Sequence, residues 1–160
     1  MDAVFNGLND RQREAVFTAQ GPLLVLAGAG SGKTTVLVRR IDYLVRYGNA
    51  YYSTETPERM LFEPYIEKLE SLAQMPDLSG ELLDSALATF AVNPVRPYQI
   101  LAITFTNKAA GEIKERLEKA LGEQALDIWA GTFHSVCAKL LRMYIDRLGF
   151  EKSFTIYDTD

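Results

Sequence analysis

A glycine-rich segment placed between an apolar run and a helical pattern constrains this chain more than any other feature. Residues 23–27 are continuously apolar, which predicts a strand buried on both faces of a sheet. Glycines recur through residues 28–32, and from Lys33 apolar residues repeat every three or four positions through about Tyr47, which predicts a helix. A buried strand, a glycine-rich turn and a helix in this order are the context that a phosphate-binding loop requires.

The residue types in this turn suit the binding of a nucleotide. Glycines let backbone N–H groups turn inward, and the helix that follows adds unpaired N–H groups and its positive dipole end. Lys33 can reach the β- and γ-phosphates, and the Thr34 hydroxyl can ligate Mg²⁺, so these two residues are the catalytic candidates. The nucleotide-binding candidates here are Ala27, Gly28, Ala29, Gly30, Ser31, Gly32, Lys33, Thr34 and Thr35. The alternative is a glycine-rich turn with a surface lysine, because Ala27 replaces the first glycine of the generic pattern.

Strands and helices alternate along the chain outside residues 50–97. The predicted strands are 23–27, 99–105, 125–130 and 154–157, and the predicted helices are 8–16, 33–47, about 108–121 and about 133–148. Asn9 is the expected N-cap of the first helix, and Gly122 and Gly149 end the last two. Alternation of this kind predicts an α/β fold, with a parallel sheet flanked by helices.

Residues 50–97 differ from the rest of the chain. Within them, residues 51–97 carry eight acidic and three basic side chains, a net charge of −5. Thr56 and Pro57 are expected to start a helical stretch that reaches Met75, with an interruption or kink at Pro64, and a second helix is expected from Ser79 to about Phe90. This acidic helical insertion either docks a protein partner or caps an exposed sheet edge.

Composition limits the class of protein. Of the 160 residues, 48% are hydrophobic and 24% charged, which is a globular balance, and the longest apolar stretch, residues 22–27, is too short to span a membrane. Cys137 is the only cysteine, which excludes an internal disulfide and a cysteine-based metal site, and no secretion signal opens the sequence. We therefore expect a cytoplasmic protein. The net charge of −4 argues weakly against a nucleic-acid surface spread over the whole chain.

Three further segments make the chain resemble the superfamily 1 DNA helicases of the UvrD, Rep and PcrA type. Residues 8–16 are similar to the Q motif of that family, residues 104–110 to its motif Ia, and residues 131–135 to its motif Ib. The resemblance implies that Gln12 reads the adenine edge of ATP. It also implies contacts with single-stranded DNA from Phe105, Thr106, Asn107, Lys108, Thr132, Phe133, His134 and Ser135.

The resemblance also implies an architecture and an activity. Residues 1–160 would form part of the first RecA-like lobe, a P-loop NTPase sheet that carries the helical insertion at about residues 50–97. The whole enzyme would use ATP and Mg²⁺ to translocate on single-stranded DNA and open duplex junctions, together with the remaining helicase lobes of the same polypeptide. The Asp-Glu pair of the family's later motifs has no counterpart here, so we expect the chain to bind nucleotide without turnover.

Two departures from the family leave alternatives open. Relatives join the phosphate-loop helix to the motif Ia strand by a short link, and many place arginine where this chain has Thr35. A different P-loop enzyme such as a nucleotide kinase, or a nucleic-acid-binding module without catalysis, would also retain the glycine-rich loop.

Overall fold

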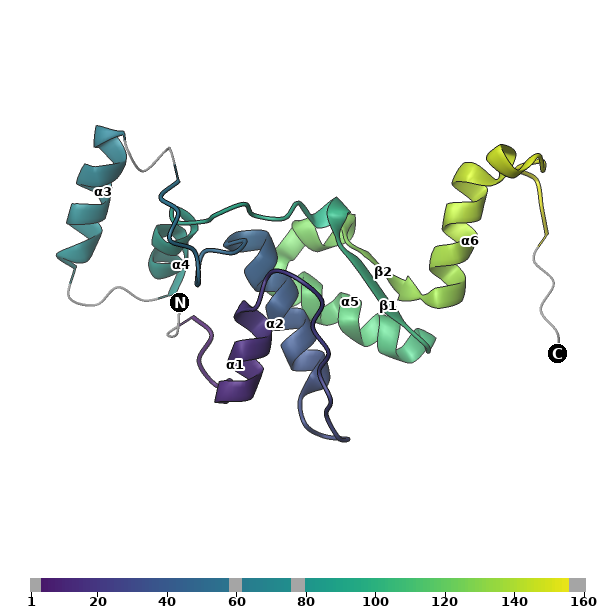
Figure 1. The fold of residues 1–160 in the computed structure, drawn as a ribbon, viewed down its shortest axis with the longest axis horizontal. Helices are drawn as coiled ribbons and strands as arrows, with labels where there is room; N and C mark the ends of the chain where they lie inside the picture. Colours follow the sequence, from purple (N-terminus) through teal and green to yellow (C-terminus); the bar gives the residue numbers. More distant parts are fainter. Residues whose placement is uncertain (1–3, 58–61, 76–79, 156–160) are drawn as a thin grey trace. The chain divides into compact units, whose positions relative to one another are not determined.

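The computed structural model describes residues 4–57, 62–75 and 80–155. It divides the chain into two compact units, residues 1–97 and 98–160 (Figure 1). No helix among the described residues is both long enough and apolar enough to cross a membrane.

The first unit is built on two packed helices, α1 (Asp10–Phe17) and α2 (Lys33–Arg46). The predicted cap of α1 is confirmed: the Asn9 carboxamide accepts the Gln12 N–H at 2.9 Å, and the Gln12 carboxamide accepts the Asn9 N–H at 3.0 Å. This reciprocal capping box satisfies two N–H groups that a helix end leaves unpaired. It also fixes where the Gln12 side chain lies.

Aromatic rings form the core between these helices. Phe5 meets Phe17 edge to face at 5.4 Å between ring centroids, and Phe17 meets Tyr43 in the same manner at 5.0 Å. Edge-to-face contacts of buried rings stabilise a core beyond the area that they bury. The Arg40 guanidinium donates to the Ala15 carbonyl at 2.7 Å and also to the Thr18 carbonyl, so α2 holds the C-terminal end of α1.

The insertion contains two helices, α3 (Glu63–Ala73) and α4 (Gly80–Ala88). The prediction that the first begins at Thr56–Pro57 was wrong, because Phe62 is the N-cap. Of the two effects predicted at Pro64, an interruption agrees with the start of α3, and Pro64 lies in its first turn. A proline there removes no intrahelical hydrogen bond, so α3 needs no kink. The predicted start of the second helix at Ser79 lies outside the described residues.

Backbone hydrogen bonds close the insertion at its base. Asn49 N–H donates to the Val92 carbonyl at 2.8 Å, Val92 N–H donates to the Tyr47 carbonyl at 3.1 Å, and Val95 N–H donates to the Leu44 carbonyl at 2.9 Å. Gly48 and Val92 form a parallel bridge. Gly48 has φ +64°, and a Cβ there would lie 1.9 Å from the Val92 carbonyl oxygen, so only glycine fits this junction.

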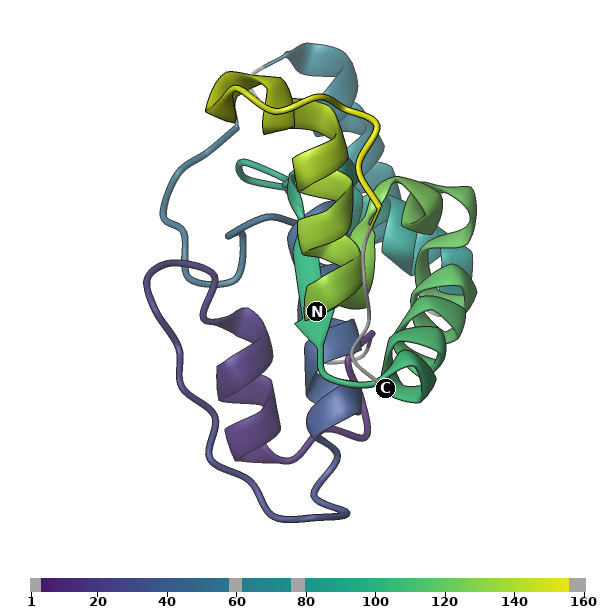
Figure 2. The same cartoon turned by 90° about the vertical axis from the view of Figure 1, so that its right-hand side faces the viewer.

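The second unit centres on two parallel strands, β1 (Leu101–Thr104) and β2 (Trp129–Thr132). The helix α5 (Asn107–Leu121) and the short 3-10 helix η3 (Gly122–Asp127) connect them, and α6 (Phe133–Tyr144) follows β2 and continues into η4 (Ile145–Leu148). Both α5 and α6 pack against the strands, and Figure 2 shows α6 in front of β1 with α5 to its right. The predicted alternation of strand and helix is confirmed for this unit.

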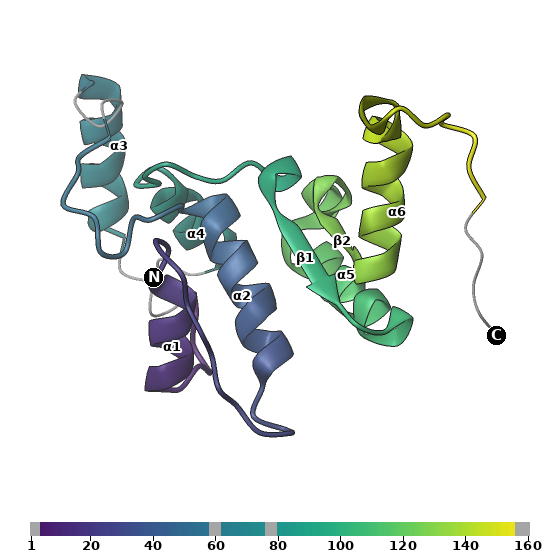
Figure 3. The same cartoon turned by 45° about the vertical axis from the view of Figure 1, so that its right-hand side comes forward.

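Three strand predictions need correction. Residues 23–27 form no strand: they run through the long loop between α1 and α2 (Figure 3), and Leu24 and Leu26 are 80% and 86% exposed. A strand requires hydrogen-bonding neighbours, and within the described residues only β1 and β2 pair into a sheet. The predicted strand 125–130 begins instead at Trp129, after η3. Phe154 and Thr155 are not in a strand, and the rest of the predicted strand 154–157 lies outside the described residues.

Candidate functional site

The glycine-rich loop of the first unit folds around the Lys33 side chain. The Lys33 ammonium donates to the carbonyl of Ala27 at 2.9 Å and to that of Gly28 at 2.5 Å. Gly28 also accepts from the Ser31 hydroxyl at 2.7 Å and from the Ser31 N–H at 3.4 Å, which closes the turn. The side chain of Lys33 therefore folds back from α2, and its ammonium lies against the loop that precedes the helix.

Gln12 reaches the same loop from α1. Its side-chain Nε2 donates to the Ser31 carbonyl at 3.0 Å, 19 residues along the chain. Gly32 has φ +81°, and a Cβ at Gly32 would lie 2.9 Å from the same Nε2. A side chain at position 32 would thus be strained by its backbone and would press on the Gln12 amide. The structure brings together the predicted adenine reader and the predicted phosphate loop.

The N-terminus of α2 faces the loop without a side-chain cap. Its N-cap is Gly32, and the first intrahelical bond runs from the Val36 N–H to the Gly32 carbonyl at 3.0 Å. A helix start of this kind offers N–H groups and a positive dipole end to an anion. The Thr34 side chain is half-buried at this position, whereas Thr35 is exposed.

Charged groups anchor the far end of α2. Arg46 Nε donates to the buried Asp42 carboxylate at 2.7 Å, and Arg46 Nη1 and the Tyr47 hydroxyl both donate to Asp84 of α4. Burial raises the pKa of the Asp42 carboxyl, and the neighbouring Arg46 and Arg39 offset part of that rise. Sequence reasoning missed this network, because Asp84 lies 38 residues from Arg46.

In the second unit, polar turns follow β1 and β2 at the same edge of the sheet. Thr104 lies opposite Thr132 in the parallel register, so the two strands end together. The Thr106 hydroxyl caps α5 by accepting the Ala109 N–H at 3.2 Å, and the Thr132 hydroxyl caps α6 by accepting the Ser135 N–H at 3.2 Å. Two helix N-termini therefore begin at one edge of the sheet.

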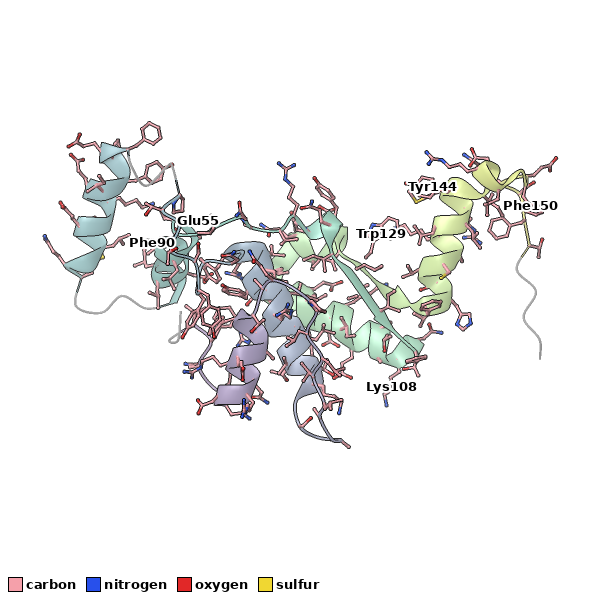
Figure 4. All side chains as sticks on the ribbon, viewed as in Figure 1. Glu55, Phe90, Lys108, Trp129, Tyr144 and Phe150 are labelled. Atoms are coloured by element: carbon pink, nitrogen blue, oxygen red, sulfur yellow. The ribbon has the colours of Figure 1, made fainter. Side chains whose placement is uncertain are left out.

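Most side chains of these turns are open to contact, whereas Thr132 is buried. Phe105 is 95% exposed and Phe133 57% exposed, while Asn107, Lys108 and His134 are also exposed. Figure 4 shows Lys108 projecting outward at the start of α5. Ser135 is also exposed, and its hydroxyl donates to the Thr132 carbonyl at 2.9 Å. A Cβ on Gly131 would lie 2.7 Å from that hydroxyl, so the glycine leaves room for this bond.

A neighbouring pocket of the second unit was not predicted. It has a volume of about 440 Å³ and lies among α5, η3, β2 and α6. The Lys139 ammonium lies over the Trp129 ring, 4.3 Å from its centroid, at this pocket. The two residues are ten positions apart and belong to no pattern that a sequence alone would single out.

The predicted site residues thus form two groups, one in each unit. Gln12 and residues 27–35 surround the loop of the first unit, and residues 105–108 and 132–135 follow the two strands of the second. Among the described residues, no group of three or more His, Cys, Asp or Glu side chains could hold a metal ion. The first group contains an ammonium, glycines and a helix start without a side-chain cap, but the strand expected before the loop is not formed.

Comparison with known proteins gives the family. The model of the UvrD/REP helicase N-terminal domain matches residues 8–58 and 82–160. The chain is 42% identical over 158 residues to the ATP-dependent DNA helicase PcrA of Staphylococcus aureus (strain Mu50), and also to PcrA of Staphylococcus epidermidis (strain ATCC 12228). Each match covers 99% of this chain and 16% of the length of the relative. The chain belongs to the UvrD/REP helicase family.

Proposed function

We propose that this chain is the ATP-binding start of the motor in an ATP-dependent DNA helicase. The observation that carries the proposal is the position of Lys33, whose ammonium lies against the carbonyls of the glycine-rich loop at 2.9 and 2.5 Å. Membership of the helicase family and the name of the PcrA relatives support the same activity. In this proposal the lobe is RecA-like, residues 1–160 form part of it, and the insertion lies at about residues 50–97.

The phosphates of ATP would bind where the loop meets α2. Residues 27–32 supply the backbone of the cradle, Lys33 supplies a positive charge for the β- and γ-phosphates, and the helix start adds its dipole. Gln12 holds the loop through the Ser31 carbonyl at 3.0 Å, and its amide would also read the adenine edge. The Gln12 side chain would then both recognise the adenine base and hold the glycine-rich loop in position.

The residues around this loop fit a magnesium ion that is held mainly by phosphate. The described residues include no carboxylate cluster for a metal, and Thr34 places a hydroxyl in the first turn of α2. When bound, Mg²⁺ would neutralise charge that develops on the phosphates. Thr34 would hold the ion, and Lys33 would orient the phosphates beside it.

Single-stranded DNA would contact the edge at which β1 and β2 end. Phe105 offers a 95% exposed ring for base stacking, and Thr106, Asn107 and Lys108 offer polar contacts to the DNA backbone. Thr132, Phe133, His134 and Ser135 would contact the strand from the second turn, which begins at the same level of the sheet. Together with the remaining lobes of the polypeptide, ATP-driven closure would move the enzyme along the strand toward duplex junctions.

Nucleotide binding is tested by titrating a fluorescent ATP analogue with Mg²⁺ into the 160-residue chain. Lys33→Ala should weaken binding about tenfold or more, because it removes the charge that pairs with the phosphates. Lys114→Ala, which removes an exposed lysine from α5, is the matched control and should bind like the parent. Equal affinity of the Lys33→Ala and parent chains would remove the assignment of the loop.

Turnover separates the helicase from its rivals. The sequence contains no adjacent Asp-Glu pair, so the 160-residue chain should bind ATP and release no phosphate. A longer polypeptide that includes the later motifs should hydrolyse ATP, and single-stranded DNA should accelerate it many-fold. A nucleotide kinase would ignore the DNA, and a binding module would bind DNA without hydrolysis.

A further inference from the structure

The helix α3 carries apolar side chains that the described residues leave exposed. Phe62, Tyr65 and Ile66 are 64%, 39% and 43% exposed. These residues and Leu72 follow the three- and four-residue spacing that places side chains on one side of a helix. An exposed apolar face of this kind marks an interaction surface when it lies on an ordered helix.

The family comparison distinguishes α3 from the other exposed apolar helix. The apolar face of α6, which includes Leu140, Leu141 and Tyr144, lies within the range that the family model matches, so elements shared by the family can cover it. The model skips residues 59–81, which contain α3. The apolar face of α3 therefore belongs to a segment that the family model does not match.

The second helix of the insertion anchors it to the motor. Asp84 of α4 accepts from Arg46 and from the Tyr47 hydroxyl at the end of α2, and Ala86 is buried. Figures 1 and 3 show α4 between α3 and α2. Within the insertion, α4 is hydrogen-bonded to the end of α2, and α3 carries exposed apolar side chains.

Charge indicates the chemistry of the occupant. Glu63, Glu67 and Glu70 lie along α3 beside its apolar face, and residues 51–97 carry a net charge of −5. This charge repels DNA and attracts a basic surface. We propose that α3 is a docking helix for a protein partner that presents an apolar groove with a basic rim, in the manner of an amphipathic helix bound in a groove.

The probe is a fluorescein-labelled basic amphipathic peptide built of repeated Leu-Lys-Lys-Leu units, and the 160-residue chain is titrated into it by fluorescence anisotropy. Ile66→Asp should weaken binding about tenfold, because it removes apolar contact at the centre of the face. Leu126→Asp is the matched control, since Leu126 is a 72% exposed leucine in the second unit. This control should bind like the parent.

Charge reversal tests the basic rim separately. Glu67→Lys with Glu70→Lys should weaken binding about tenfold, whereas Glu118→Lys with Glu123→Lys, which changes the net charge equally, should not. Ile66→Leu should restore the affinity lost in Ile66→Asp. The proposal is overturned if test and control variants behave alike. It is also overturned if sedimentation shows a dimer that Ile66→Asp dissolves, because the occupant is then a second copy of the chain.

Discussion

Replacing Gly48 by alanine should open the base of the insertion. The new Cβ would lie 1.9 Å from the Val92 carbonyl oxygen and 2.6 Å from the Asn93 carbonyl carbon and oxygen, all of them backbone atoms that no side-chain rotation can move. The two chain segments at Gly48 and Val92 must move apart, and the three backbone hydrogen bonds made by Leu44, Tyr47 and Asn49 are lost. At about 0.5–1.5 kcal/mol for each bond and about 1–2 kcal/mol for a side chain at positive φ, the free energy of unfolding should fall by about 2.5–6.5 kcal/mol.

The structure provides an assay and a control for this prediction. Urea unfolding of the first unit can be followed by near-ultraviolet circular dichroism of its buried tyrosines, while fluorescence of Trp129, the only tryptophan, reports the second unit. Gly21→Ala has a similar backbone, φ +76°, but its Cβ meets nothing within 4 Å, so it should cost only the strain of about 1–2 kcal/mol. Equal losses for the two variants would refute the reasoning from the close contact.

Three further outcomes follow from the contacts of the two units. Burial raises the pKa of the Asp42 carboxyl, so its protonated form stabilises the fold fully at pH values below the ordinary pKa of an aspartate. This contribution to the free energy of unfolding is lost as pH rises through the raised pKa. Asp42→Asn should therefore remove this pH dependence from urea unfolding measured across pH. Gly32→Ala should weaken ATP-analogue binding about tenfold in titrations, because it strains the backbone at φ +81° and its Cβ presses on the Gln12 amide. Phe105→Ala should lose about 1–3 kcal/mol of affinity for oligo-dT in anisotropy measurements, with Leu126→Ala unchanged.

Features set by neighbouring residues could be predicted from the sequence. The Asn9 cap of α1, the helix that begins at Lys33 and the glycine that ends α5 all depend on local hydrogen bonds and backbone preference, and all three are confirmed. The parallel pairing that ends β1 and β2 at one edge also follows from the strand–helix–strand order.

Features set by distant partners could not be predicted. Residues 23–27 have the composition of a buried strand, but a strand exists only when another chain segment pairs with it, and composition does not supply one. The start of α3 was misplaced because Thr56–Pro57 and Phe62–Pro64 are both acceptable starts locally. The link between Arg46 and Asp84 crosses 38 residues and leaves no periodic signal.

The bridge between Gly48 and Val92 determines where the sequence of this chain can be replaced. The chain leaves the end of α2 at Gly48 and returns to the same point at Val92. The residues between Gly48 and Val92 therefore form an excursion whose two ends are hydrogen-bonded to each other. The number of residues in this excursion can therefore change without changing where the chain continues toward β1. A fluorescent or affinity module could therefore replace the outer part of that loop without changing the connection to β1.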